Sequence, residues 1–186
     1  VFIFSGRISQ EKGVLELVKA YKQLKSREGI KLVIVGSAQT SNTIVDAYTQ
    51  MVYDEIEDIK EDVVFTGYVK HDDMPYVYKM ADVAILPSTG QDPAPLTIFE
   101  AMASGLPIIT TYSGGIPEYA TEECAMINKI DAQLVDNMTE SINELISNKE
   151  KRITMGKASI GRVGKFSTEN YYNDFVEIVS AINLKR

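Results

Sequence analysis

Two acidic residues flank the start of a short predicted helix in the segment QDPAPLTIFEAMASG. Asp92 and Glu100 are separated by seven residues, and the apolar run VAILPS comes just before them. A helix N-terminus offers unpaired N–H groups and partial positive charge, which suit a phosphate. Carboxylates repel a bare phosphate, yet they accept hydrogen bonds from sugar hydroxyls. The combination predicts a site for a ligand that carries both groups, such as a nucleotide sugar.

A second set of candidate residues follows the first apolar run of the chain. The segment SGRISQEKG carries Arg7 and Lys12, and its glycines Gly6 and Gly13 allow a close backbone approach. Arginine grips a phosphate with two parallel hydrogen bonds, and lysine supplies a point charge. The two cations either hold a diphosphate and stabilise it as a leaving group, or they are solvated loop residues. This loop alone leaves both interpretations open.

Composition excludes several classes of protein. The net charge of −7 argues against a nucleic-acid partner or an anionic membrane surface. No apolar run approaches the roughly 20 residues that span a bilayer, and we expect no signal peptide. One histidine and one cysteine exclude a zinc site of the usual kind and an internal disulfide, so we expect no metal. Cys124 is interpreted as a core or loop residue, consistent with a reducing cytoplasm.

Apolar runs recur at the spacing of alternating strands and helices. Their nearly continuous apolar content predicts strands that are buried on both faces. The expected strands are residues 1–5, 31–36, 62–67, 83–87 and 107–112, with a weaker sixth at 125–129. The alternation predicts an α/β fold, a Rossmann-like doubly wound parallel sheet of about six strands with flanking helices.

Helical periodicity fills most of the segments between these runs. We expect a first helix that Gly29 ends, a second over residues 41–57, and a short third over 72–81 that is entered through Asp72 or Asp73. The apolar face of the first helix comprises Val14, Leu17, Val18, Tyr21 and Leu24.

Two further helices are expected near the end of the chain. One runs from an N-cap at Asp131 to about Asn148, and Ser167 caps the last. The shared face of the last helix comprises Tyr171, Phe175, Ile178, Val179 and Ile182. In doubly wound sheets, ligands bind outside the carboxyl ends of the strands, where the topology switches sides. The loops at those ends are residues 5–13, 36–42, 67–73, 87–95 and 112–118.

The segments SGRISQEKG, VVFTGYV, ADVAILPS, DPAPLTIFEAMASGLPII and SGGIPE follow one another in an order that resembles a known family. They are similar to the C-terminal, donor-binding lobe of retaining, nucleotide-sugar-dependent glycosyltransferases of the group 1 (family 4) type. The resemblance covers nearly the whole chain and implies GT-B architecture, with two facing Rossmann-like lobes. Residues 1–186 would form the donor lobe. Because residue 1 is a strand-like Val, we expect the N-terminal acceptor lobe to be absent from this chain.

The resemblance implies a role for each candidate side chain. Arg7 and Lys12 would bind the donor diphosphate and neutralise charge as the glycosidic bond breaks, with Gly6 leaving room for it. Glu100 would accept hydrogen bonds from the ribose hydroxyls. Asp92 would address the transferred sugar. The four charged residues of this set are the expected catalytic residues.

Backbone groups supply the remaining donor contacts that the resemblance implies. N–H groups of Ala94 and Leu96 would reach the sugar or phosphate, since the prolines beside them have none. The segment near Gly67 and Tyr68 would approach the base. Ser88 is a further donor-site residue that we expect to serve the backbone first.

Other residues near these segments receive plainer interpretations. Gly114 and Gly115 are expected to serve the backbone first, with ligand contact second. Glu118 either caps or pairs locally or contacts the ligand. His71 is expected to lie at the surface.

Asp92 departs from the family pattern, which usually has Glu at this place. The side chain is one methylene shorter, so it either reaches differently or selects another sugar. Two alternatives therefore stay open: a nucleotide-sugar binding module without transfer activity, and a GT-B-type sugar-nucleotide epimerase, which would need more titratable residues. The sequence lacks the motifs of nicotinamide dehydrogenases, P-loop NTPases and α/β-hydrolases.

The whole protein is expected to move a sugar from a UDP- or GDP-sugar to an acceptor hydroxyl with retention, without a cofactor. The acceptor, a glycan, lipid or protein, would bind the other lobe, and the base and sugar stay open. We expect a cytoplasmic enzyme, peripheral at the inner membrane face, with no nucleic-acid partner and no membrane insertion by this lobe. The lobe alone is expected to bind donor weakly and to transfer little.

Overall fold

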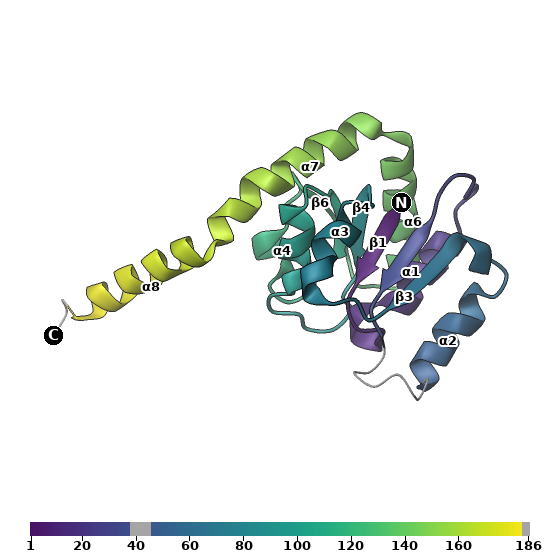
Figure 1. Ribbon diagram of the computed structural model, residues 1–186, viewed down its shortest axis with the longest axis horizontal. Coiled ribbons are helices and arrows are strands. Elements are labelled where there is room, and N and C mark those ends of the chain that lie inside the picture. Colours follow the sequence, from purple (N-terminus) through teal and green to yellow (C-terminus); the bar gives the residue numbers. More distant parts are fainter. Residues whose placement is uncertain (38–45, 184–186) are drawn as a thin grey trace.

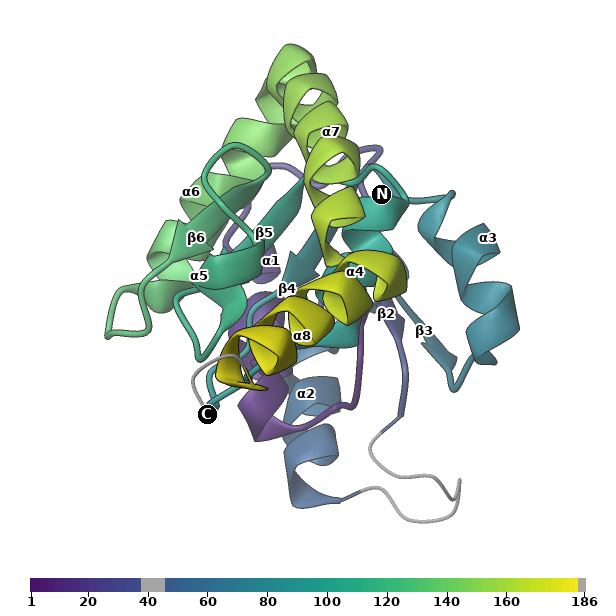
Figure 2. The same ribbon diagram turned by 90° about the vertical axis from the view of Figure 1, so that its left-hand side faces the viewer.

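The computed structural model describes residues 1–37 and 46–183, which form a six-stranded parallel sheet with helices on both faces (Figures 1 and 2). The strand order is β3-β2-β1-β4-β5-β6. The strands β2 and β3 are added on one side of β1, and β4, β5 and β6 are added on its other side, so the topology switches between β1 and β4. The strands are β1 (Phe2–Ser5), β2 (Leu32–Val35), β3 (Val63–Gly67), β4 (Val83–Leu86), β5 (Ile108–Thr111) and β6 (Ala125–Asn128). All six expected strands and the doubly wound fold are confirmed.

Alternation of side chains along the strands divides the core into two layers. Phe2 and Phe4 of β1 face a layer formed with α1, α2 and α6, whereas Ile3 faces a layer formed with α3, α4 and α5. The helices are α1 (Val14–Lys22), α2 (Ala47–Ile56), α3 (Met74–Tyr78), α4 (Leu96–Ala103), α5 (Ile116–Tyr119), α6 (Leu134–Ser147), α7 (Lys149–Val163) and α8 (Thr168–Asn183). Short 3₁₀ helices span Gln10–Lys12, Lys60–Asp62, His71–Asp73 and Gly164–Phe166.

Several expected boundaries and burial patterns differ from the structure. The α1 helix ends at Lys22, so Gly29 is not the residue that ends it. The N-cap of α6 is Gln133, and Asp131 instead accepts a hydrogen bond from the Gln133 N–H. The strand β3 is an edge strand, so Val64 is 47% exposed rather than buried on both faces.

The other helix predictions are mostly confirmed. The α2 helix begins after Asp46, whose side chain accepts from the Thr49 N–H, and residues 41–45 of the expected helix lie outside the described residues. The α3 helix is entered through Asp73. The predicted apolar residues of α1 are all buried: Val14, Leu17, Val18, Tyr21 and Leu24.

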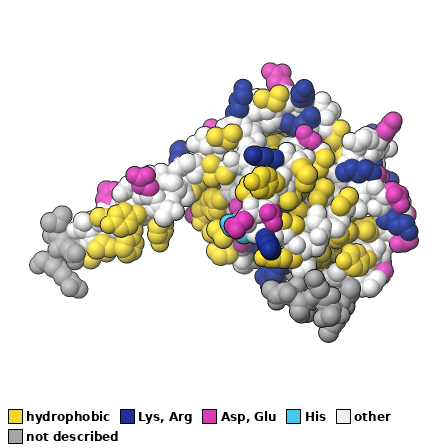
Figure 3. All heavy atoms as spheres, viewed as in Figure 1, with side chains coloured by type: hydrophobic (Ala, Val, Ile, Leu, Met, Phe, Trp, Pro, Cys, Tyr) yellow, Lys and Arg dark blue, Asp and Glu magenta, His cyan; other side chains and the backbone are white. Residues whose placement is uncertain are grey.

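The last helix projects away from the sheet (Figure 1). Ser167 accepts a hydrogen bond from the Asn170 N–H, as expected of its cap. The predicted apolar face is exposed, and hydrophobic side chains gather along the projecting helix in the space-filling view (Figure 3). The apolar periodicity of this segment correctly predicts a helix. The apolar residues of that helix do not pack on the sheet in this structure.

Backbone segments meet closely at the end of β1, both on the side of β4 and on the side of β2. Gly13 has a φ of 67°, and a Cβ atom placed there would lie 2.0 Å from the carbonyl oxygen of Pro87. Gly36, with a φ of 131°, approaches Gly6 in the same way, since a Cβ atom would lie 1.9 Å from the Gly6 carbonyl oxygen. These glycines are needed for contact as well as for their backbone angles.

The close contact at Gly13 can be tested by comparison with a glycine that has a positive φ but no close neighbour. Gly29 has a φ of 71° and open space around it. We expect Gly29→Ala to lower the free energy of unfolding by about 1–2 kcal/mol, the cost of a left-handed residue. Gly13→Ala should cost at least about 2 kcal/mol more, because Pro87 must also move. Urea unfolding of both variants measures the difference, and equal losses would contradict the close contact.

Candidate functional site

The loop after β1 and the loop after β4 are joined by backbone hydrogen bonds. The N–H groups of Thr89 and Gly90 both donate to the carbonyl oxygen of Glu11, at 2.9 and 3.1 Å. The Thr89 hydroxyl donates to the carbonyl oxygen of Gln10 at 2.7 Å. The two loops in which the sequence places its cations and its first acid therefore form one rigid unit at the switch point of the sheet.

Lys12 and Asp92 meet within this unit. The Lys12 Nζ lies 2.5 Å from the Asp92 Oδ2, and the Ser88 hydroxyl donates to the same oxygen at 3.0 Å. Their side chains are 25% and 13% exposed, so the pair is partly shielded from solvent. Both of these bonds go to Oδ2, and neither uses Oδ1 of the Asp92 carboxylate. The sequence did not predict this ion pair.

Arg7 is far more exposed to solvent than Lys12. Its guanidinium Nη2 lies 3.9 Å from the Glu11 carboxylate, and both side chains are about 70% exposed. An exposed pair of this geometry contributes little to stability. Arg7 is therefore easily redirected toward an anion that enters the site.

The loop that carries Asp92 is held from its other side by the glycine loop after β5. The Gly115 N–H donates to the Asp92 carbonyl oxygen at 3.1 Å, and the Ser113 hydroxyl donates to the Gly90 carbonyl oxygen. A Cβ atom at Gly114 would lie 2.3 Å from the Asp92 carbonyl oxygen. Gly114 and Gly115 thus have the backbone role that the sequence indicates for them.

Glu100 is held by groups that the sequence did not single out. The Tyr78 hydroxyl donates to its Oε2 at 3.0 Å, and the His71 Nδ1 lies 3.6 Å from its Oε1. His71 is exposed, as expected, although it lies at the candidate site. Tyr78 was missed because its spacing in α3 marks it as a core residue, which it also is. No sequence signal shows where its hydroxyl points.

Tyr78 remains a hydrogen-bond donor at neutral pH. Burial raises the pKa of its hydroxyl most, a hydrogen bond with Ser5 lowers it, and the Glu100 carboxylate raises it again. The net shift of the pKa is upward, above its usual range. The proton of this hydrogen bond therefore stays on Tyr78.

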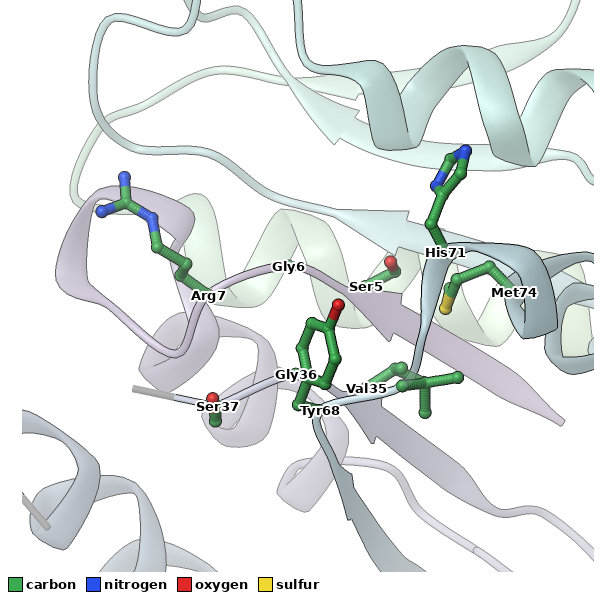
Figure 4. Close-up of a pocket in the computed structure, with 10 residues that line it drawn as sticks. Ser5, Gly6, Arg7, Val35, Gly36, Ser37, Tyr68, His71 and Met74 are labelled. Atoms are coloured by element: carbon green, nitrogen blue, oxygen red, sulfur yellow. The ribbon is translucent and has the colours of Figure 1, made fainter. Parts of the chain in front are cut away.

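Three cavities adjoin one another along the carboxyl edge of the sheet. The first, about 330 Å³, has Arg7 at one end and His71 and Met74 at the other, with Ser5 and the ring of Tyr68 between them (Figure 4). The second, about 350 Å³, shares Arg7 and contains Lys12 and Asp92. The third, about 430 Å³, shares His71 and Met74 and contains Glu100. The remaining lining includes Gly6, Val35, Gly36, Ser37 and Val69 in the first cavity.

Some predicted contact residues lie outside these cavities. Ala94 and Leu96 are exposed at the start of α4 and line none of the three. Gly67 accepts a hydrogen bond from the Gly36 N–H at 2.9 Å and so supports the wall of the first cavity rather than lining it. Glu118 accepts a hydrogen bond from Arg162 through its carbonyl oxygen, while the sequence left its role open.

The described parts of the chain contain neither a metal-binding cluster nor a membrane-spanning helix. Over residues 1–37 and 46–183, no three His, Cys, Asp or Glu side chains are grouped closely enough to hold a metal ion. In the same ranges, no helix has both the length and the apolar content needed to cross a membrane.

Comparison with characterised sequences places the chain among sugar-transferring enzymes. Residues 1–162 match the family model described as Glycosyl transferases group 1. The chain is 32% identical over 179 residues to the lipopolysaccharide 1,2-N-acetylglucosaminetransferase of Salmonella typhimurium, covering 95% of this chain and 47% of that protein. It is 30% identical over 170 residues to the GDP-mannose-dependent monoacylated alpha-(1-6)-phosphatidylinositol monomannoside mannosyltransferase of Corynebacterium glutamicum, covering 88% of this chain and 42% of that one.

Solved structures share the fold. Anabaena Alr3699/HepE in complex with UDP superimposes with a TM-score of 0.83 at 21% identity, over 97% of this chain and 48% of that chain. The chain thus spans about half the length of the curated relatives and of the structure that it matches. The family match covers most of the sequence, and the chain therefore belongs to the group 1 glycosyltransferases, with the fold of their GT-B C-terminal lobe.

Proposed function

We propose that the chain is the donor-binding lobe of a retaining glycosyltransferase that uses a nucleoside diphosphate sugar. The observation that carries the proposal is the row of three adjoining cavities, which has cations and a carboxylate at one end and a second carboxylate at the other. A nucleotide sugar carries a diphosphate that the cations can bind and hydroxyl groups that both carboxylates can accept from. Relatives named for N-acetylglucosamine or GDP-mannose transfer, and a neighbour solved with UDP, support this class of donor.

The base is assigned to the first cavity, beside the exposed ring of Tyr68. Stacking on an aromatic ring suits any base, so the residues here do not select UDP over GDP. At the His71 end of this cavity, Glu100 is close enough to accept hydrogen bonds from ribose hydroxyls. The ribose would therefore lie between the first and third cavities.

The diphosphate is assigned to the Arg7 and Lys12 side of the row, where the first and second cavities share a wall. Negative charge grows on the diphosphate as the glycosidic bond breaks, so these cations stabilise the leaving group more as the reaction proceeds. Asp92, in the second cavity, would accept hydrogen bonds from the transferred sugar through Oδ1. This division of roles needs no cofactor beyond the donor itself.

The Lys12–Asp92 pair must loosen before Lys12 can serve the diphosphate. In the structure Lys12 donates to Asp92, and the carboxylate repels any phosphate that approaches the same ammonium group. The ion pair is also the observation that favours a second candidate function, a nucleotide-sugar binder without transfer activity. In that case Asp92 would only hold Lys12 and would not address a sugar.

Acceptor recognition is assigned to residues outside this chain, because the chain spans about half of its relatives' length. Names of relatives point to lipopolysaccharide and phosphatidylinositol glycolipids, so we propose a glycan or glycolipid acceptor and an enzyme that works at the inner face of a membrane. The lobe by itself should bind donor and transfer little or no sugar. Transfer by the purified chain alone would contradict this assignment.

Arg7→Ala should weaken the binding of UDP or GDP about tenfold or more, because a charge-assisted contact to the diphosphate is lost. Binding of uridine or guanosine, which lack phosphate, should change little. Lys60→Ala is the matched control, since Lys60 is likewise exposed and pairs with Glu57 before β3, at the other end of the strands. Calorimetric titration of the three proteins measures the effect. Equal losses for nucleoside and nucleotide would remove Arg7 from the diphosphate site.

Asp92→Asn should raise the affinity for UDP or GDP about threefold to tenfold. The substitution removes the carboxylate that neutralises Lys12 and repels the incoming diphosphate. Asp58→Asn, which removes a carboxylate 2.9 Å from Lys22 and far from the site, is the control. Calorimetry at two salt concentrations should show the gain shrinking as salt rises. Unchanged or weaker binding would mean that Asp92 does not restrain Lys12.

The two candidate functions differ in their response to Asp92→Glu in the full polypeptide with its acceptor half. If the natural sequence transfers sugar, Asp92 is competent and the enzyme function stands. If sugar release and transfer occur only in Asp92→Glu, the natural chain is a binding module. The measurement is transfer from radiolabelled UDP- and GDP-sugars to membrane glycolipid extracts.

A further inference from the structure

Tyr78 joins three elements that meet beneath the candidate ribose site. It lies at the end of α3 and is buried, with 1% of its surface exposed. Its hydroxyl donates to Glu100 of α4 at 3.0 Å, and the Ser5 side chain at the end of β1 also acts on it by lowering its pKa. The partner of this core hydroxyl is therefore a carboxylate that lines the third cavity together with Tyr78.

The bond to Tyr78 sets the direction of the Glu100 carboxylate. Oε2 is engaged by the tyrosine, and Oε1 is turned to the side of His71, which lines both the first and the third cavity. The Glu100 side chain is 26% exposed and lies beside a cavity of about 430 Å³. Without the tyrosine bond, this space would let the carboxylate rotate into several rotamers.

A fixed carboxylate recognises hydroxyl groups better than a mobile one. Ordering a glutamate side chain on binding costs conformational entropy, of the order of 1 kcal/mol or more. In this structure folding has already restricted the side chain, so a ligand would meet an acceptor that is oriented in advance.

We infer that Tyr78 is a positioning residue that holds Glu100 toward the ribose hydroxyls and thereby makes the site prefer ribonucleotides to deoxyribonucleotides. This inference rests on the proposed function, in which Glu100 accepts from ribose. Tyr78 lines the third cavity beside Glu100, and its hydroxyl acts on the nucleotide only through that carboxylate.

A purely structural tyrosine would affect ribonucleotides and deoxyribonucleotides alike. The informative quantity is therefore a ratio, the affinity for UDP or GDP divided by the affinity for the same nucleotide in its 2′-deoxy and 3′-deoxy forms. Loss of fold, loss of base stacking or loss of diphosphate contacts lowers both affinities and leaves the ratio unchanged.

The experiment compares three variants of the chain by calorimetric titration. Tyr78→Phe removes only the hydroxyl, and the ribose-to-deoxyribose ratio should fall about threefold to tenfold. Glu100→Gln should lower the ratio at least as far. Tyr21→Phe is the matched control, because Tyr21 is also fully buried and its hydroxyl donates to the Ile30 carbonyl oxygen in the other core layer. Its ratio should equal that of the unsubstituted chain.

The results distinguish a failure of the positioning role of Tyr78 from a failure of the proposed donor site. A ratio that falls in Glu100→Gln but not in Tyr78→Phe overturns the positioning role and leaves the donor site intact. A ratio unchanged in Glu100→Gln, or no binding of UDP and GDP by the unsubstituted chain at millimolar concentration, overturns the ribose assignment and the inference with it.

A measurement on the unsubstituted chain covers the case in which Tyr78→Phe does not fold. Carbon-13 labelling of the tyrosine rings reports the hydrogen bond of each hydroxyl through its chemical shift. The Tyr78 signal should move on addition of the ribonucleotide and move at most half as far with the 2′,3′-dideoxy form, because only ribose hydroxyls donate to the carboxylate that Tyr78 holds. Equal movements with both ligands would refute the coupling.

Discussion

Close backbone contact between the loop after β1 and the loop after β4 is the constraint on which the site depends. Gly13 allows it, because any side chain there would overlap the Pro87 carbonyl group. The Glu11 carbonyl oxygen then accepts two N–H groups from the second loop. Without this approach the cations and the first acid would lie on separate, independently moving loops. The parallel packing of β1 beside β4 makes the contact possible.

The two carboxylates of the site are prepared in different ways. Asp92 accepts from an ammonium group and a hydroxyl, so its charge is largely compensated before any ligand enters. Glu100 accepts from the neutral hydroxyl of Tyr78, and the group nearest its other oxygen is His71, which is exposed. Under the proposed function, an anionic diphosphate would compete with Asp92 for Lys12, whereas the approach of a neutral ribose to Glu100 would involve no such competition. The two carboxylates of the site thus have different electrostatic surroundings.

Much of the fold was predictable because burial on two faces leaves a strong pattern in the sequence. The strands, the buried face of α1 and the caps at Asp73 and Ser167 follow from local apolar content and turn chemistry. Helix ends depend on where neighbouring elements stop the chain, so Gly29 and Asp131 were misplaced as boundaries. The exposure of the α8 face shows that periodicity marks an amphipathic helix without stating what it packs against.

The sequence by itself determined which residue types lie at the carboxyl edge of the sheet, since motif order and strand pattern are local properties. It placed Lys12 and Asp92 on loops that a doubly wound sheet brings together. Only the tertiary structure decided that the two side chains form an ion pair, and that a buried hydroxyl from α3 holds Glu100. Such contacts join residues 80 and 22 positions apart, and their geometry depends on packing between elements rather than on spacing along the chain.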